Sequence, residues 1–381
     1  MAKKEQKIDL NFPNPTTENF PLTLDGLIAN RAYLIKQHDS GNPNYKYVGN
    51  CTKKFADQIV NKYFEKTWNW VKSVEFPDGN EFPVKMSKLE NELNNLIEKD
   101  NSWKTRSALI RYFHKGTFLN SNRDGHMTPI QFWKHIQTDE QAFRDFYHNR
   151  LRCSDWFKEK NREDPSKTNQ FHLVNGYVAP FIWSIGVDTS RKAPLVSFFK
   201  PSLAKYLVKK YLNEFSEVGD VFSGMSARML GVLACGKKYV GSDLNKNVLK
   251  ESKELMKFAE PIFKKHRLNP EWSLKFEDAI VTKHEFESML ICSPYASAEQ
   301  WNGISSNISC DKWIDIVLTN NKAKRYVFVT DDTIVKYRPY IKEQLENISH
   351  FGSNFEDVVV IDRSDLVDIK LDISTNILSC Q

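Results

Sequence analysis

Apolar residues in the first half of the chain recur at helical spacing. Phe55, Ile59, Tyr63 and Trp68 fall about one turn apart, and Leu93, Leu96 and Ile97 share a face after a capping box at 87–90. Thr128-Pro129 is typical of a helix start with proline in the first helical position, and 138–141 is a second capping box. We therefore expect a mainly helical N-terminal domain over residues 1–185.

From about residue 200, helical and strand patterns alternate. Strand-like apolar segments are separated by helical ones, at 218–222, 239–240, 273–276, 289–291 and 326–329. Two further segments, 358–361 and 367–371, suit an antiparallel hairpin at a sheet edge. This alternation predicts an α/β domain over 186–381, with a mostly parallel sheet covered on both faces. Ligands of such sheets bind at the carboxyl ends of the strands.

A turn of small residues, 223–227, follows the first of these strands and opens a helix. The second strand ends on Asp243, nineteen residues after Gly224. Small residues let the backbone approach a ligand, and an acidic side chain at the next strand end accepts hydrogen bonds from ribose hydroxyls. The pattern fits a nucleotide-binding βαβ unit or an ordinary turn with a surface aspartate. Arg228, just after the turn, suits contact with a phosphate or a place capping the turn's surface, and we favour the second.

Charge is distributed unevenly along the chain. The net charge is +6, and residues 101–200 hold 16 Lys and Arg against 9 Asp and Glu, together with 17 aromatic residues. Basic groups among aromatic ones suit phosphate neutralisation and base stacking. A solvated basic face over an aromatic-rich core explains the same composition, and the two interpretations stay open here.

The sequence shows no sign of a membrane, metal or disulfide framework. No apolar run approaches the roughly 20 residues of a membrane span, and the basic N-terminus lacks the apolar stretch of a secretory signal. The six cysteines have no C-x-x-C spacing, which favours reduced thiols over disulfides or a zinc site. We expect a cytoplasmic protein without a metal.

Taken together, the strand-end positions resemble those of the S-adenosylmethionine-dependent DNA methyltransferases that modify exocyclic amines. The resemblance covers roughly residues 175–365. It implies a Rossmann-like class I methyltransferase fold, a mostly parallel seven-stranded sheet with an antiparallel edge, and S-adenosylmethionine as cofactor. The implied cofactor-binding residues are Phe199, Lys200 and Pro201 of a lysine-proline motif, then Asp220, Phe222, Ser223 and Gly224 of the glycine motif, and Asp243, Leu244 and Asp278 after the next strands.

Cys292-Ser293-Pro294-Tyr295 resembles the catalytic motif of that family but departs from it at the first two positions. Pro294 and Tyr295 match, so Tyr295 is expected to stack on a flipped base. Cys292 replaces the usual Asp, Asn or Ser, and a thiol is a weak acceptor. It is a permissive substitution, a nucleophile that adds to a pyrimidine ring, or a sign of lost or altered chemistry.

The resemblance implies methyl transfer to a DNA base, with adenine N6 as first choice and cytosine N4 as second. The alternatives are a pyrimidine C5 methyltransferase and a catalytically inactive DNA-binding protein of the same fold. The motif order leaves little room for a DNA-reading domain after the catalytic motif, which assigns target recognition to residues 1–185. The expected partner is DNA, in a bacterium or a phage-infected bacterial cell; the existence of a cognate restriction enzyme and the oligomeric state stay open.

Overall fold

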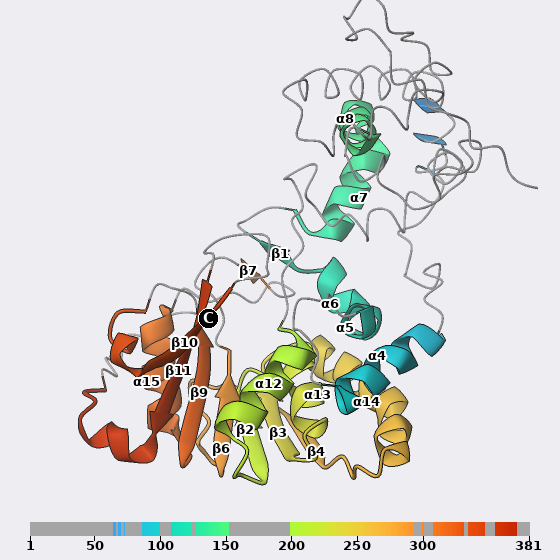
Figure 1. The fold of residues 1–381 in the computed structure, drawn as a ribbon. Helices are drawn as coiled ribbons and strands as arrows, with labels where there is room; N and C mark the ends of the chain where they lie inside the picture. The colour runs from blue at the N-terminus through green and yellow to red at the C-terminus, as the bar shows by residue number, and fades with distance from the viewer. Residues whose placement is uncertain are drawn as a thin grey trace, which may run out of the picture. The chain divides into compact units, whose positions relative to one another are not determined.

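The computed structural model describes residues 64–65, 68–69, 72, 86–99, 108–123, 127–151, 199–292, 299–300, 308–330, 334–346 and 355–371. The chain forms two compact units, each built from two separate stretches. One unit comprises residues 1–77 and 131–191, and the other comprises residues 78–130 and 192–381. Figure 1 shows the elements of each.

The second unit contains a seven-stranded sheet in the order β10-β11-β9-β6-β2-β3-β4. Neighbouring strands from β9 to β4 are parallel, while β11 is antiparallel to both β9 and β10. The strands are β2 (Glu217–Asp220), β3 (Lys238–Asp243), β4 (Trp272–Phe276), β6 (Ser288–Ile291), β9 (Arg325–Thr330), β10 (Ile341–Glu346) and β11 (Phe355–Asp362). This order and these directions are those of the expected class I methyltransferase fold, which the structure confirms.

The antiparallel edge is built differently from the expected hairpin of 358–361 with 367–371. β11 pairs with β10 on one side and with β9 on the other, so both of its edges are occupied. After β11 the chain turns into the 3-10 helix η3 (Arg363–Val367), which a capping box between Asp362 and Asp365 stabilises. The expected second strand of the hairpin was therefore wrong.

Four helices of this unit follow the sequence pattern closely: α12 (Pro201–Tyr211), α13 (Ala227–Leu233), α14 (Lys246–Lys265) and α15 (Cys310–Asn320). The start of α14 is set by Asn245, whose side-chain oxygen accepts hydrogen bonds from two backbone N–H groups of the first turn. A buried cluster joins α15 to β6, β9 and β11 and includes Met289, Ile314 and Phe328.

Three helices from the first half of the chain belong to the sheet-bearing unit: α4 (Met86–Glu98), α5 (Ala108–Phe113) and α6 (Lys115–Leu119). All three lie against α14 (Figure 1). The buried ammonium of Lys205 in α12 donates to the carbonyls of Leu96, Ile97 and Lys99 at distances of 2.7, 2.9 and 3.0 Å. Because these carbonyls end α4, Lys205 caps that helix. The compact units thus divide the chain at other points than residue 185.

Two short pairs of strands complete this unit. β1 (Asn122–Arg123) pairs antiparallel with β7 (Glu299–Gln300), and β5 (His284–Glu285) pairs parallel with β8 (Asn321–Lys322). The first pair joins the segment after α6 to the segment after Cys292.

In the other unit the structure describes mainly α7 (Pro129–Thr138) and α8 (Glu140–Leu151), and α7 begins at the expected proline. The aromatic side chains described here are mostly buried, among them Phe132, Trp133, Phe143 and Phe146. These buried rings form a core. They are therefore not available for base stacking, one of the two roles that the composition suggested. None of the helices within the described ranges has the length and apolarity that a membrane crossing requires.

Candidate functional site

The strand order reverses between β2 and β6, which lie side by side and parallel. The carboxyl end of β2 leads into the turn at 223–227, and that of β6 leads to Cys292. β3, on the other side of β2, ends on Asp243. Open α/β sheets bind ligands at such a switch point. The fold therefore brings the turn, Asp243 and Cys292 to the same edge of the sheet.

Asp220, the last residue of β2, joins several groups beneath this edge. The residue is buried, and its carboxylate accepts hydrogen bonds from Arg228 Nε at 2.7 Å, the Tyr239 hydroxyl at 2.9 Å and the backbone N–H of Phe222 at 3.1 Å. Arg228 also donates to the carbonyl of Phe222. These contacts are all within the protein, so Asp220 supports the turn; direct contact with a cofactor stays a prediction.

Arg228 is buried, which corrects the expectation that it caps the surface of the turn. Burial alone would lower the pKa of its guanidinium, but the charges of Asp220 and Cys292 outweigh burial and raise that pKa. Burial also raises the pKa of Tyr239 well above its ordinary value, and the Asp220 charge adds to the rise. The site therefore holds an arginine cation, an aspartate and a neutral tyrosine, with Cys292 within electrostatic reach of the cation.

The glycine turn adopts a backbone shape that glycine favours. Gly224 has a φ of 53° and Ser226 a φ of 63°, both in the left-handed region. The backbone N–H of Ser223 donates to the carbonyl of Ser242 at 2.9 Å, and that of Gly224 donates to Asp243 Oδ2 at 2.8 Å. The turn is thereby attached to the end of β3 at two points.

Asp243 is half-buried and held by backbone donors on both carboxylate oxygens. Besides Gly224, the backbone N–H of Asn245 donates to its Oδ1 at 2.8 Å. Burial raises the pKa of Asp243, while these two backbone hydrogen bonds oppose the rise. Each oxygen keeps acceptor capacity for a further donor. Leu244 is 42% exposed and Phe276, paired with Asp243 in the sheet, is 51% exposed, so apolar surface adjoins the carboxylate.

Asp278 follows β4 in a turn of its own and is half-buried. Its Oδ1 accepts from the backbone N–H of Ile280 at 2.9 Å, and its carbonyl accepts from that of Thr282 at 3.0 Å. The Nδ2 of Asn320 in α15 donates to the carbonyl of Ile280 at 2.6 Å and fixes the turn. His284 is half-buried and forms a 2.8 Å ion pair with Glu277 when protonated.

The lysine-proline motif lies at the start of α12, beside α13. The Phe199 ring centroid is 5.3 Å from the Arg228 guanidinium carbon, and Pro201 is the buried first residue of the helix. Gly231 of α13 allows α12 and α13 to pack closely, because a Cβ at this position would lie 2.6 Å from the Pro201 carbonyl oxygen. Phe199 and Pro201 thus adjoin the Asp220–Arg228 pair. Lys200, half-buried, precedes the helix.

Of the remaining predicted site residues, some are described by the structure and others are not. Phe222 is half-buried and packs edge-on against Trp313 of α15, with ring centroids 4.8 Å apart. Cys292 is half-buried at the end of β6. Ser293, Pro294 and Tyr295 lie outside the described residues, so their roles stay predictions.

His114, which no sequence pattern singled out, contacts the glycine turn. His114, between α5 and α6, is fully buried with its Nε2 3.0 Å from the hydroxyl oxygen of Ser226. The two residues are 112 positions apart, and no local pattern links them. Among the described residues, no group of three His, Cys, Asp or Glu side chains is arranged to hold a metal ion.

The comparisons with known proteins give similarity at the level of solved structures. No protein-family model matches the sequence, and neither does any curated protein. The chain is similar to magnesium protoporphyrin IX methyltransferase from Synechocystis PCC 6803, solved with bound SAM, at 8% identity and a TM-score of 0.31. That alignment covers 42% of this chain and 75% of the other.

Two further solved structures are similar to the same extent. Ribosomal protein L11 methylase from Lactobacillus delbrueckii subsp. bulgaricus has 8% identity and a TM-score of 0.28, with 42% of this chain and 77% of that one covered. TehB from Haemophilus influenzae has 14% identity and a TM-score of 0.28, with 42% and 66% covered. Similarity of this extent gives neither a substrate nor a cofactor for this chain.

Proposed function

We propose that this protein is an S-adenosylmethionine-dependent methyltransferase. The observation that carries the proposal is the position of Asp243. Its carboxylate is held by two backbone N–H groups, beside a turn with two left-handed residues, at the edge where β2, β3 and β6 end. A fixed carboxylate at this place suits the vicinal hydroxyls of a ribose.

The residues at this edge fit such a cofactor. The Ser223 hydroxyl is buried and has no hydrogen-bond partner among the described residues, so it is available to a polar group of a ligand. Leu244 and Phe276 offer exposed apolar surface for a flat base next to the ribose position. S-adenosylmethionine supplies an electrophilic methyl group on a sulfonium. Asp243 would hold its ribose, and the turn at 223–227 would follow its methionine part.

We propose a DNA base as the acceptor, with adenine N6 as first choice and cytosine N4 as second, on the resemblance of Cys292–Tyr295 to a catalytic motif. Tyr295 would stack on the flipped base. Cys292 and the Ser293 carbonyl would orient the amine. Its nitrogen would bond to the methyl carbon as the bond from that carbon to sulfur breaks, which leaves S-adenosylhomocysteine, and the amine proton would pass to water. The basic surplus in residues 101–200 supports a polyanionic partner.

One observation favours a second candidate, methylation at pyrimidine carbon C5. Cys292 lies within electrostatic reach of the buried Arg228 cation, which would favour a thiolate, and a nucleophilic cysteine acts as a thiolate. The thiolate would add to the ring and leave again after methyl transfer and loss of the ring proton. Because Arg228 is already ion-paired with Asp220 at 2.7 Å, this support is weaker than that for amine methylation.

The decisive experiment incubates the full chain with S-adenosylmethionine carrying a labelled methyl group and with mixed-sequence DNA. The DNA is then digested to nucleosides and separated. We expect the label in N6-methyldeoxyadenosine or in N4-methyldeoxycytidine. Label in 5-methyldeoxycytidine would support the second candidate. Cofactor binding without transfer to DNA would indicate a non-catalytic binding protein, and RNA in place of DNA tests the other polymer.

Cys292→Ser separates the two chemistries. An amine-directed enzyme should keep at least its wild-type rate, because a serine hydroxyl is a better acceptor than a thiol. A C5-directed enzyme should lose all measurable rate, because serine replaces the nucleophile. The measurement is labelled-methyl transfer under single-turnover conditions. A covalent enzyme–DNA adduct in the wild type would refute the amine assignment.

A further inference from the structure

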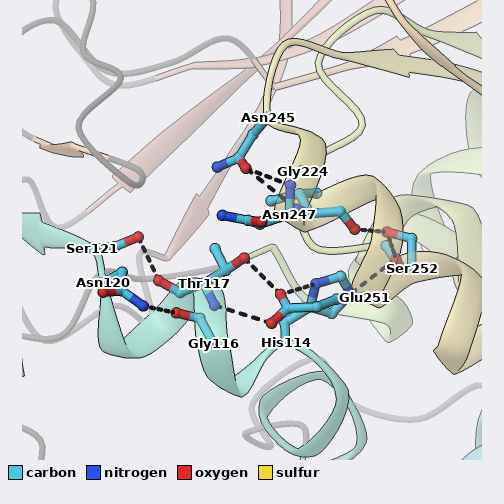
Figure 2. Close-up of polar contacts among 12 residues, drawn as sticks. His114, Gly116, Thr117, Asn120, Ser121, Gly224, Asn245, Asn247, Glu251 and Ser252 are labelled. Carbon is cyan, nitrogen blue, oxygen red and sulfur yellow. Dashed lines mark hydrogen bonds and ion pairs between the residues drawn. The ribbon is translucent and has the colours of Figure 1, made fainter. Parts of the chain in front are cut away.

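A chain of buried polar side chains joins the α5–α6 junction to the glycine turn (Figure 2). At its centre His114 is fully buried, with Nε2 3.0 Å from Ser226 Oγ. The Ser226 hydroxyl donates to Ser252 Oγ at 2.6 Å, and the Ser252 hydroxyl donates to the carbonyl of Val248, one turn earlier in α14, at 2.7 Å. The series of hydrogen bonds thus runs from helix α14 through the turn to His114.

The direction of these hydrogen bonds follows from counting protons. The Val248 carbonyl can only accept, so the single hydroxyl proton of Ser252 goes to it. The Ser226 proton then goes to Ser252, which leaves Ser226 Oγ as an acceptor toward His114. Nε2 of His114 must therefore carry a proton and donate it. This requirement holds for the neutral Nε2–H tautomer and for the imidazolium alike.

The other side of His114 is held by α6 and α14. Glu251 Oε2 lies 3.4 Å from His114 Nδ1 and accepts a 2.6 Å hydrogen bond from the Thr117 hydroxyl. The backbone N–H of Thr117 donates to the other carboxylate oxygen at 3.2 Å. Gly116 makes room for this contact, since a Cβ there would lie 2.6 Å from Glu251 Oε1. The imidazole is enclosed between a fixed carboxylate and the turn (Figure 2).

Ser226 needs this support because its backbone is unusual for a residue with a side chain. Its φ of 63° lies in the left-handed region, which disfavours residues other than glycine. It is also the N-cap of α13, yet its hydroxyl makes no cap hydrogen bond. A serine at this position ordinarily accepts from the first turn of the helix. Here the hydroxyl is committed to His114 and Ser252 instead.

We propose that His114 is a positioning residue for cofactor binding: its Nε2–H holds Ser226 in the left-handed shape that directs the Gly224 N–H to Asp243. The affinity for the cofactor is thereby set in part by helices α5 and α6, which lie outside the β-α repeat that forms the site. The inference rests on the proposed cofactor site and is independent of the identity of the methyl acceptor.

The test measures binding of S-adenosylhomocysteine to the full chain by calorimetry, with three single variants and one double variant. His114→Leu removes the donor and should weaken binding by about five- to thirtyfold. His114→Gln restores an N–H donor on a shorter side chain and should return the affinity to within about threefold of wild type. Circular dichroism and thermal melting establish that each variant is folded.

Ser226→Gly provides the matched control, since glycine adopts a positive φ without help. Measured against Ser226→Gly alone, adding His114→Leu should cause no further loss of affinity, whatever the affinity of the single variant. The proposal is overturned if His114→Leu lowers the affinity by the same factor in the wild type and in Ser226→Gly. Equal factors would mean that the two substitutions act independently, as a general packing defect does. Wild-type affinity in His114→Leu would overturn it as well.

Hydrogen exchange of the ligand-free protein separates this inference from the proposed function. His114→Leu should speed exchange of the Gly224 amide by about tenfold or more, while amides in the centre of β3 stay unchanged. Unchanged exchange at Gly224 would refute the positioning role. If the wild type binds no S-adenosylhomocysteine, the proposed cofactor is wrong, and the exchange rates still decide whether His114 holds the turn.

Discussion

Replacing Asp220 by alanine should be the most destabilising single change at the edge of the sheet. The Arg228 side chain is only 6% exposed, and the substitution removes the carboxylate that lies 2.7 Å from its guanidinium. Removing one member of a buried ion pair costs about 3–5 kcal/mol, and the Tyr239 hydroxyl also loses its acceptor. Against a typical total stability of about 5–15 kcal/mol, this is a large fraction.

Urea unfolding followed by circular dichroism measures the effect, and thermal melting should show a fall of roughly 6–20 °C for a unit of this size. Arg228→Met in the Asp220→Ala background removes the unpaired charge and should recover part of the loss. Lys257→Ala is the control, because the Lys257–Glu254 pair is exposed and such pairs contribute about 0.2–1 kcal/mol. A loss below about 1 kcal/mol in Asp220→Ala would refute the reasoning.

Two further changes test the turn and its packing. Asp243→Asn should weaken S-adenosylhomocysteine binding by roughly tenfold or more in calorimetry, since a hydrogen bond to a charged group contributes about 1.5–3 kcal/mol; unchanged affinity would remove Asp243 from the site. Gly231→Ala should destabilise the protein by about 1–3 kcal/mol in urea unfolding, because the new Cβ would lie 2.5 Å from Ala204 Cβ and must push α12 and α13 apart; wild-type stability would contradict this close packing.

Much of the sheet could be predicted because its information is local. The strands β2, β3, β4, β6 and β9 each contain a short apolar segment that can be recognised in the sequence, and Thr128-Pro129 predicts the start of α7. The contact of Gly224 with Asp243 was also accessible, since consecutive parallel strands end at one edge. Patterns of this kind depend on the period of a helix or strand and on short connections, and both can be read along the chain.

The features that could not be predicted from the sequence are contacts between side chains that lie far apart along the chain or that become buried only when the helices pack. Arg228 is a charged residue after a turn, which ordinarily indicates a surface position, and only its pairing with Asp220 explains its burial. Lys205 caps a helix more than a hundred residues earlier in the chain, and His114 contacts Ser226 across a similar separation. These partners are fixed by how α4, α5 and α6 lie against α12 and α14, and no local periodicity encodes that.

The interleaved order of the two units has a practical consequence. Residues 131–191 interrupt the sheet-bearing unit and residues 78–130 precede the interruption, so the backbone enters that unit twice. No single cut in the gene isolates it: a fragment starting near residue 186 would lack His114 and would expose the side of α14 that α4, α5 and α6 cover. A truncation meant for crystallisation should start near residue 78, and removing residues 131–191 as well requires a linker from residue 130 to residue 192.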